Sequence, residues 1–195
     1  MQHTIFALEV CARLEPGSTM RSRLADLLKG HPVRANLSHK HYFYNMVCRE
    51  LLSGFASVEK GCWDYFDDDA RARKDFEMWS QGMITEEGAR TAPSGTPAGE
   101  DPYRGSSEPR YLTFTMAFLM KEGTITDLHM RNRCNVPQPQ LWKRDTFMRL
   151  LQGVMNLSFV SVRGDVAYLI PGDPSWALTP QDLTHPKFHY LRPVE

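Results

Sequence analysis

The sequence lacks the features that mark several large classes of protein. With 23 basic and 23 acidic residues among 195 it has no formal net charge, so no overall field draws it to nucleic acid or to an anionic membrane. No apolar run approaches the roughly 20 residues of a membrane helix. The opening residues, MQHTIFALEV, lack the basic region and cleavage site of a signal peptide. We expect a cytoplasmic protein with no membrane insertion and no nucleic-acid partner.

Catalytic and cofactor-binding motifs are also missing. The sequence contains no P-loop, no dinucleotide-type glycine pattern, no GxSxG and no HExxH, so we expect no cofactor. Four scattered cysteines without a CxxC pair predict reduced, mostly buried thiols. Cys134 is the candidate for a reactive thiol, because Arg131, Arg133 and His129 would lower its pKa; an inert thiol in a loop is the alternative.

One change of composition divides the chain. Residues 88–110 are rich in Pro, Gly and Ser, and such a segment buries too little apolar surface to offset the entropy of ordering it. We therefore predict a flexible linker between an N-terminal half, residues 1–87, and a C-terminal half, residues 111–195. The 42% of hydrophobic residues is enough for a core, and we expect both halves to pack as one domain.

The pattern of apolar residues predicts the elements of each half. Alternation every second residue is typical of strands, and spacing of three to four residues is typical of helices. We predict strands at 4–14, 62–66, 111–120 and 157–171, and helices at 18–29, 38–54, 67–87 and 145–156. The sequence predicts an α+β fold: a mixed, largely antiparallel sheet of about four strands, covered by helices, in a single domain with a long disordered insertion.

Two further segments have specific interpretations. The RGD sequence of residues 163–165 is expected to form a bulge or turn in the last strand, rather than an adhesion motif. Near the C-terminus, Thr179, Pro180 and Asp182 have the residue types of a helix N-terminus. We interpret this region as a latch that closes the fold, rather than as the lip of an active site.

Two groups of residues are weak candidates for metal ligands. His39, His41 and Cys48 lie close in sequence, but residues two apart on a helix point to different sides, so a shared metal would require an extended chain there. The Asp67–Asp69 run offers carboxylate oxygens for Ca²⁺ or Mg²⁺, yet the spacing of a calcium-binding loop is absent. A solvated acidic helix start explains the run more simply.

A basic and aromatic cluster is the candidate for partner binding. The segment HMRNRCNVPQPQLWKR combines arginine with an aromatic ring, and both residue types dominate interface hot spots. The candidate residues are Arg131, Arg133, Trp142, Lys143 and Arg144. A solvated, proline-interrupted loop with one core tryptophan is the alternative.

The order of several segments resembles a known family. The strand YLTFTMAFLM, the helix TFMRLLQGVMN, the strand VAYLIPG and the closing ALTPQDL and HPKFHYL are similar to the C-terminal half of a domain of unknown function. Cyanobacteria and plants share that domain, and its plant members include a thylakoid protein implicated in acclimation to fluctuating light. The resemblance implies an α+β domain with a regulatory or scaffolding role and supplies no catalytic residues. Many members carry a glycine-rich segment and a hydrophobic span that this sequence does not show.

Three functional hypotheses follow. The first is a non-enzymatic cytosolic adaptor or regulatory protein that binds another protein. The second is a small metal-dependent hydrolase or other enzyme that uses His39, His41, Cys48 and Asp67–Asp69. The third is a self-assembling structural protein, most simply a homodimer formed through an exposed edge strand.

Overall fold

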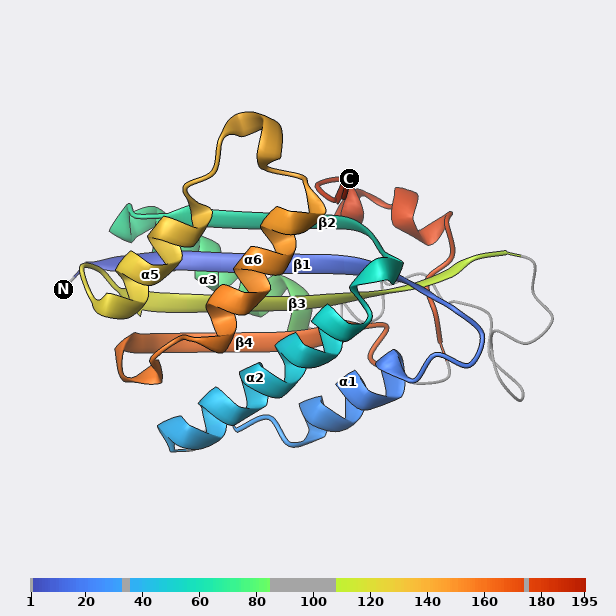
Figure 1. Cartoon of the computed structure of the whole chain (residues 1–195), viewed down its shortest axis with the longest axis horizontal. Helices are drawn as coiled ribbons and strands as arrows, with labels where there is room; N and C mark the ends of the chain where they lie inside the picture. The colour runs from blue at the N-terminus through green and yellow to red at the C-terminus, as the bar shows by residue number, and fades with distance from the viewer. Residues whose placement is uncertain (1, 33–35, 85–107, 174–175) are drawn as a thin grey trace.

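A computed structural model describes residues 2–32, 36–84, 108–173 and 176–195. These residues form an α+β domain around one sheet, which confirms the predicted fold class (Figure 1). Most of the predicted linker, residues 88–107, lies outside the described residues, as does the predicted disorder of that insertion. No described helix is both long enough and apolar enough to cross a membrane.

The sheet has five described strands in the order β4-β3-β1-β2-β5, and every neighbouring pair is antiparallel. Central strands β1, His3–Leu14, and β3, Arg110–Lys121, pair along their whole length. The two halves predicted from the sequence therefore share one sheet. The sequence predicted a mixed, largely antiparallel sheet of about four strands. The fifth strand of the structure is the short β5, Arg192–Pro193, which pairs with β2.

The strands that flank the central pair, β2 and β4, begin at other residues than the sequence pattern predicted. Strand β2 covers Val58–Phe66 and starts four residues before the predicted strand. Strand β4 covers Val162–Ile170, after a single turn of 3-10 helix. Its register against β3 shifts at Arg163, so the predicted bulge at the RGD sequence is confirmed.

The described helices are α1, Met20–Lys29; α2, Leu37–Ser53; α3, Asp69–Ile84; α5, Ile125–Cys134; and α6, Arg144–Met155. The sequence pattern missed α5 entirely, because Ile125 is 86% exposed and Leu128 is 48% exposed. The buried residues of this helix are Thr126, Asp127 and Met130. They do not form the apolar stripe by which an amphipathic helix is recognised in a sequence.

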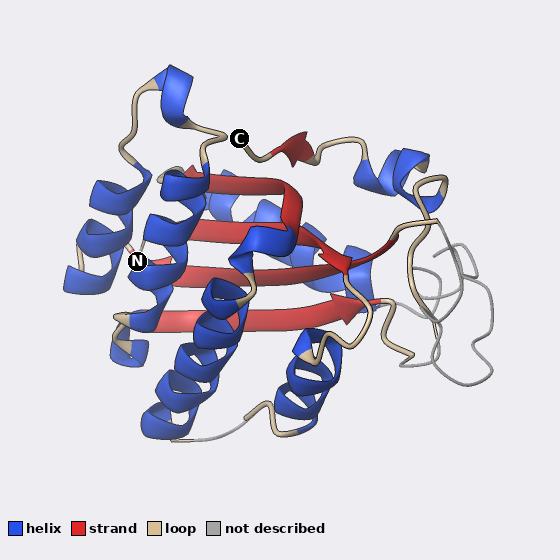
Figure 2. Cartoon of the chain, turned by 45° about the vertical axis from the view of Figure 1, so that its right-hand side comes forward, coloured by secondary structure: helices blue, strands red, loops and turns tan. Residues whose placement is uncertain are grey.

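The two faces of the sheet are covered differently. Helices α1, α2, α5 and α6 lie on one face, and α3 lies on the other (Figures 1 and 2). The first face holds the main apolar core, to which β1 contributes Phe6, Leu8 and Val10. The second face holds smaller clusters beneath α3 and the C-terminal segment. Both faces of β1 are therefore buried.

The fold contains an internal repeat. Each half runs strand, helix, helix, 3-10 turn, strand, as β1-α1-α2-β2 and β3-α5-α6-β4, and the second half has one additional 3-10 turn, Gln138–Gln140, between its helices. Equivalent strands have equal lengths of 12 and 9 residues, and the outer pairs share a register with a bulge at the same place. Leu8 and Met116 occupy equivalent positions and pair with each other, so an approximate two-fold axis passes between them.

The repeat is interlocked, because helices of each half pack on the outer strand of the other. Helix α1 contacts β4, and α5 contacts β2. Phe147 of α6 lies so close to Gly61 of β2 that an added Cβ would come within 2.5 Å of its ring. At the equivalent place in the other half, Tyr44 of α2 meets Asp165 of β4. Neither half buries its own strands alone.

The C-terminal segment closes the second face. Leu178 forms a two-way backbone bridge with Tyr111 of β3, both hydrogen bonds being 2.8 Å. Thr179 and Asp182 exchange reciprocal hydrogen bonds of a capping box, at 2.8 and 3.1 Å. The predicted helix is only a 3-10 turn, Asp182–Thr184, because Pro186 follows at once.

Candidate partner-binding site

Two grooves lie at equivalent places in the repeat, each between a helix of one half and the outer strand of the other. The larger, about 770 Å³, runs between α1 and β4 and is named here the α1–β4 groove. The smaller, about 480 Å³, runs between α5 and β2 and is named the α5–β2 groove. The interlocked packing explains both, since each helix sits beside a strand from the other half of the chain.

The edges beside the two grooves differ. The outer edge of β2 is partly occupied by β5, through Lys60 with Pro193 and Gly61 with Arg192. At the other end of the sheet, no strand within the described ranges pairs with the outer edge of β4. The backbone N–H and C=O groups of β4 that point away from β3 therefore lie at an open edge of the sheet, and the α1–β4 groove is beside this strand.

The walls of the α1–β4 groove are mainly apolar. Ala25 and Leu28 line it from α1, and Ala167 and Leu169 line it from β4. At the rim, Lys29 and Asp26 form an exposed ion pair of 2.8 Å. Exposed pairs of this kind add little to stability, so they are free to rearrange when another chain approaches.

One end of the groove is anchored by a buried carboxylate. Asp165 is 2% exposed and contacts Lys40, Tyr44 at 3.0 Å and His31 at 3.3 Å. Burial alone would raise the pKa of Asp165, but hydrogen bonds from His31 and Lys40, and the charge of Lys40, hold that pKa below its usual value. The aspartate of the RGD sequence therefore joins α2 to β4 inside the domain.

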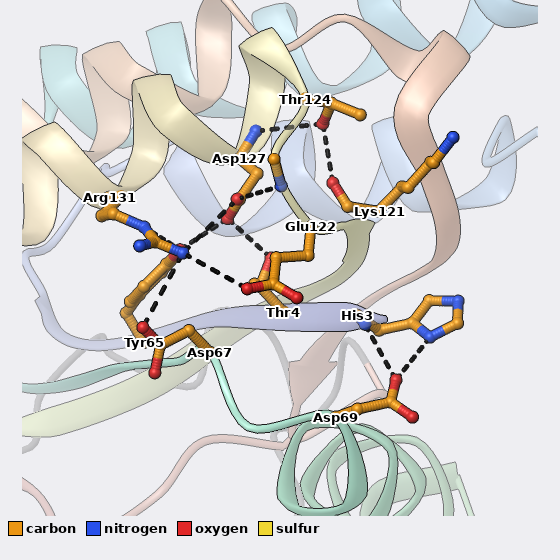
Figure 3. Close-up of polar contacts among 11 residues, drawn as sticks. His3, Thr4, Tyr65, Asp67, Asp69, Lys121, Glu122, Thr124, Asp127 and Arg131 are labelled. Carbon is orange, nitrogen blue, oxygen red and sulfur yellow. Dashed lines mark hydrogen bonds and ion pairs between the residues drawn. The ribbon is translucent and has the colours of Figure 1, made fainter. Parts of the chain in front are cut away.

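The α5–β2 groove ends in a second buried carboxylate, shown in Figure 3. Asp127 is fully buried and accepts hydrogen bonds from Thr4 at 2.8 Å, Tyr65 at 2.5 Å and the backbone of Gly123 at 2.8 Å. Arg131 lies above it and donates to the Tyr65 hydroxyl at 3.2 Å. Burial, together with the hydrogen bond to Asp127, raises the pKa of Tyr65, so this tyrosine stays neutral.

Arg131, one of the predicted partner-binding residues, has several acidic neighbours. Its guanidinium is 3.7 Å from Asp67 and Asp127 and 4.0 Å from Glu122 (Figure 3). Its side chain is nevertheless 40% exposed. Arg131 therefore forms part of the α5–β2 groove wall while its charge is compensated within the domain.

The other residues of the predicted cluster also make internal contacts. Arg144 donates to the carbonyls of Phe55 and Val58, at 3.0 Å each. Lys143 lies 2.6 Å from Glu195, Trp142 packs near the Phe147 ring, and Arg133 lies against Gly153. The structure places these residues on α5, α6 and the turn between them, where each helps to hold neighbouring elements.

The predicted metal ligands lie on opposite faces of the sheet. His39, His41 and Cys48 are on α2, whereas Asp67–Asp69 lead into α3 (Figure 1). The side chain of Asn36 caps α2 by accepting a hydrogen bond from the backbone N–H of His39 at 2.9 Å. No three His, Cys, Asp or Glu side chains are grouped to hold a metal ion among the residues that the structure describes.

The individual contacts of these residues are structural. The ring of His41 lies 3.3 Å from the Leu157 carbonyl, and burial raises the pKa of Cys48. In the acidic run, Asp68 caps α3 by accepting a hydrogen bond from the backbone N–H of Arg71 at 2.8 Å. Asp69 instead binds His3 at 2.7 Å, as Figure 3 shows.

The prediction that Cys134 has a lowered pKa is wrong. Burial of its thiol, in the wall of the α5–β2 groove, raises that pKa to about 12, and the charge of Arg149 opposes this only in part. The thiolate is the reactive form, so burial disfavours the form of Cys134 that would react.

Comparison with known proteins found no matching family model, no matching curated protein and no matching solved structure. The resemblance to the domain shared by cyanobacteria and plants therefore stays a prediction. The function must be argued from the grooves, the open edge and the buried polar groups of this chain.

Proposed function

We propose that this chain is a non-enzymatic cytosolic adaptor or regulatory protein that binds an extended segment of another protein along the open edge of β4. The observation that carries the proposal is the difference between the two ends of the sheet. The edge of β2 is covered by the chain's own β5, while the equivalent edge of β4 has no partner among the described strands.

The internal repeat supports strand addition at this place. Strand β5 pairs antiparallel with β2, at Lys60 and Gly61. The equivalent positions in the other half are Gly164 and Asp165 of β4. A segment bound there would repeat the geometry that the domain already forms at its other end, with main-chain hydrogen bonds supplying affinity and side-chain pockets supplying specificity.

The groove indicates the chemistry of that segment. Its walls are small or apolar at Ala25, Leu28 and Leu169, and successive residues of a strand point to opposite faces. A segment with apolar residues at alternate positions would bury one row of side chains against α1 and leave the other row on the α3 face. The mixed charges at the rim, Asp26 and Lys29, accept a polar flank of either sign.

A single segment fits this edge better than a second copy of the whole domain. Helices α1 and α2 lie beyond β4, alongside its open edge (Figures 1 and 2). An antiparallel pair of identical strands has a two-fold axis perpendicular to the sheet, so a second copy would bring its own α1 and α2 to the same side. An extended peptide has no such bulk.

The experiment is selection of twelve-residue peptides from a displayed library against the intact protein, followed by calorimetry with the selected sequences. We expect peptides that alternate apolar residues, with micromolar affinity. Ala25→Lys should weaken their binding at least about tenfold, since it places a charge in the apolar wall. Ala70→Lys, at an exposed position on α3, is the matched control and should bind normally.

Two results would overturn the proposal. One is selection of peptides that bind Ala25→Lys as tightly as the unchanged protein. The other is a stable homodimer in sedimentation experiments, with the α1–β4 groove occupied by the second copy, which would favour the self-assembly hypothesis.

A further inference from the structure

One position of the outer strands differs between the two halves of the repeat. Leu8 of β1 and Met116 of β3 are equivalent, and the residues that pair with them are Trp63 of β2 and Ala167 of β4. Directly paired residues lie on the same face of a sheet, and both Trp63 and Ala167 pack against the main apolar core. Trp63 and Ala167 are therefore equivalent residues, and each lines the groove beside its own strand.

Aromatic side chains of the chain itself line the α5–β2 groove. Trp63 lines it from β2, and its indole N–H donates a 2.8 Å hydrogen bond to the carbonyl of Leu141. Tyr65, two residues further along β2, adds a second ring, which lies beneath the guanidinium of Arg131. The groove that remains between these side chains is about 480 Å³.

The α1–β4 groove has small side chains at the same places. The equivalents of Trp63 and Tyr65 are Ala167 and Leu169 of β4, and Ala25 of α1 is a further small residue in the wall. The groove is about 770 Å³, against about 480 Å³ for its counterpart. The larger hollow therefore lies where one half of the repeat has aliphatic side chains and the other half has aromatic ones.

The charges at the α1–β4 groove favour an uncharged occupant. Asp26 and Lys29 of the rim compensate each other in a 2.8 Å ion pair. His31, which also lines the groove, lies 3.3 Å from the buried carboxylate of Asp165. A large uncharged side chain matches the aliphatic walls between these groups, whereas a charge buried against such walls would lose its hydration at a cost.

We propose that the α1–β4 groove binds an aromatic side chain of the partner segment, tryptophan above all, in the place that Trp63 takes in the other half. The inference rests on the proposed function, because a strand added to β4 would bring that side chain into position. A residue of the added strand that pairs with Ala167 has its Cβ about 4.5–5.5 Å away, on the same face of the sheet. Its ring would lie between Ala167 and Ala25. The partner is thereby narrowed to a segment with an aromatic residue at one fixed place.

The test begins with the peptides selected for the open edge of β4. We expect them to share an aromatic residue at one position. Calorimetry on the full chain would compare each peptide with the form that has alanine at that position. The alanine form should bind at least about tenfold more weakly, because an aromatic ring buries a large apolar area.

Substitutions in the groove locate the ring. Ala167→Trp supplies a ring from within the chain, as Trp63 does in the other half, so this variant should bind the aromatic peptide and its alanine form with equal affinity. Ala25→Leu narrows the groove from the opposite wall by a smaller change and should reduce the difference between the two peptides. Ala70→Trp, at an exposed position of α3 on the other face of the sheet (Figure 1), is the matched control and should keep the full difference. Circular dichroism would show that each variant is folded.

The outcomes distinguish this inference from the proposed function. Peptides that protect the amides of β4, yet lose less than about twofold in affinity when alanine replaces the ring, would overturn the aromatic pocket and leave strand addition standing. An undiminished difference between the two peptides in folded Ala167→Trp would also overturn the pocket. If no peptide binds, strand addition fails, and 5-fluoroindole followed by fluorine NMR tests the pocket alone. Saturable binding that Ala167→Trp abolishes would support the pocket, and absence of such binding would overturn it.

Discussion

The hydroxyl of Tyr44 on α2 donates a 3.0 Å hydrogen bond to the buried carboxylate of Asp165 on β4, and so ties the first half of the chain to the second. The equivalent contact in the other half is apolar, between Phe147 of α6 and Gly61 of β2. The two halves thus interlock through different chemistry at the same place. The stability of the domain should depend on both contacts.

Asp165→Asn should lower the free energy of unfolding by about 1–3 kcal/mol at pH 7, because Lys40 and His31 lose a buried charged partner. The folded pKa of Asp165 lies below the ordinary aspartate value of 3.8. Its stabilising effect is therefore complete well above pH 3.8 and is lost as the pH falls through the folded pKa. Urea unfolding at several pH values checks this, with the exposed Asp26→Asn as control; an effect that does not shrink in acid would contradict it.

Gly61→Ala should destabilise the domain by about 1–3 kcal/mol, because its Cβ would meet the buried Phe147 ring at 2.5 Å. Phe147→Leu in the same chain should recover part of that loss by vacating the space. Thermal unfolding of the single and double variants gives the coupling. Gly172→Ala, where the nearest atom is 3.8 Å away, is the control, and simple additivity of the two changes would refute the contact.

Glu9→Gln should change the dependence of stability on pH. Burial raises the pKa of Glu9 above the ordinary glutamate value of 4.5, although the hydroxyls of Tyr190, Thr113 and Thr115 and the charge of Lys187 oppose that rise. A raised pKa of an acid means that folding disfavours its ionised form, so the native protein loses stability as the pH rises above 4.5. The melting temperature of Glu9→Gln, relative to the unchanged protein, should rise between pH 4 and pH 8. A flat or falling difference would show that Glu9 is ionised without penalty.

The cysteines should react slowly with thiol reagents in the native protein. Burial raises the pKa of Cys11, Cys62 and Cys134 to about 12 each, so about one thiol in 10⁴ is ionised at pH 8. Labelling followed by mass spectrometry should show rapid reaction only after denaturation. Fast labelling of native Cys134 would restore the idea of a reactive thiol at that position.

Much of the fold follows from the sequence, because long strands and amphipathic helices leave periodic patterns. The alternation in residues 111–120 and the apolar stripe of residues 145–156 identified β3 and α6 closely. Helix α5 was not predicted, because its buried residues are Thr126, Asp127 and Met130, and these do not form a periodic hydrophobic pattern. Helix α2 begins at Leu37, one residue before the predicted range of 38–54, because the side chain of Asn36 caps it.

The candidate sites could not be predicted from the sequence, because residues far apart in the chain form them. The α1–β4 groove joins residues about 140 positions apart, and nothing in the sequence shows that α1 crosses to the other half of the repeat. Glu9 was visible as one polar residue in an otherwise apolar strand. In the structure it is buried, and Tyr190 of the C-terminal segment, about 180 positions away, donates a hydrogen bond to it.

The most direct test of the proposed function is amide hydrogen exchange of the full chain, measured residue by residue, with and without a selected peptide. Strand addition predicts that the amides of β4 that point away from β3 become protected when the peptide binds, while those of β2 beside β5 do not change. Protection elsewhere, with the amides of β4 still exchanging freely, would contradict binding at this edge.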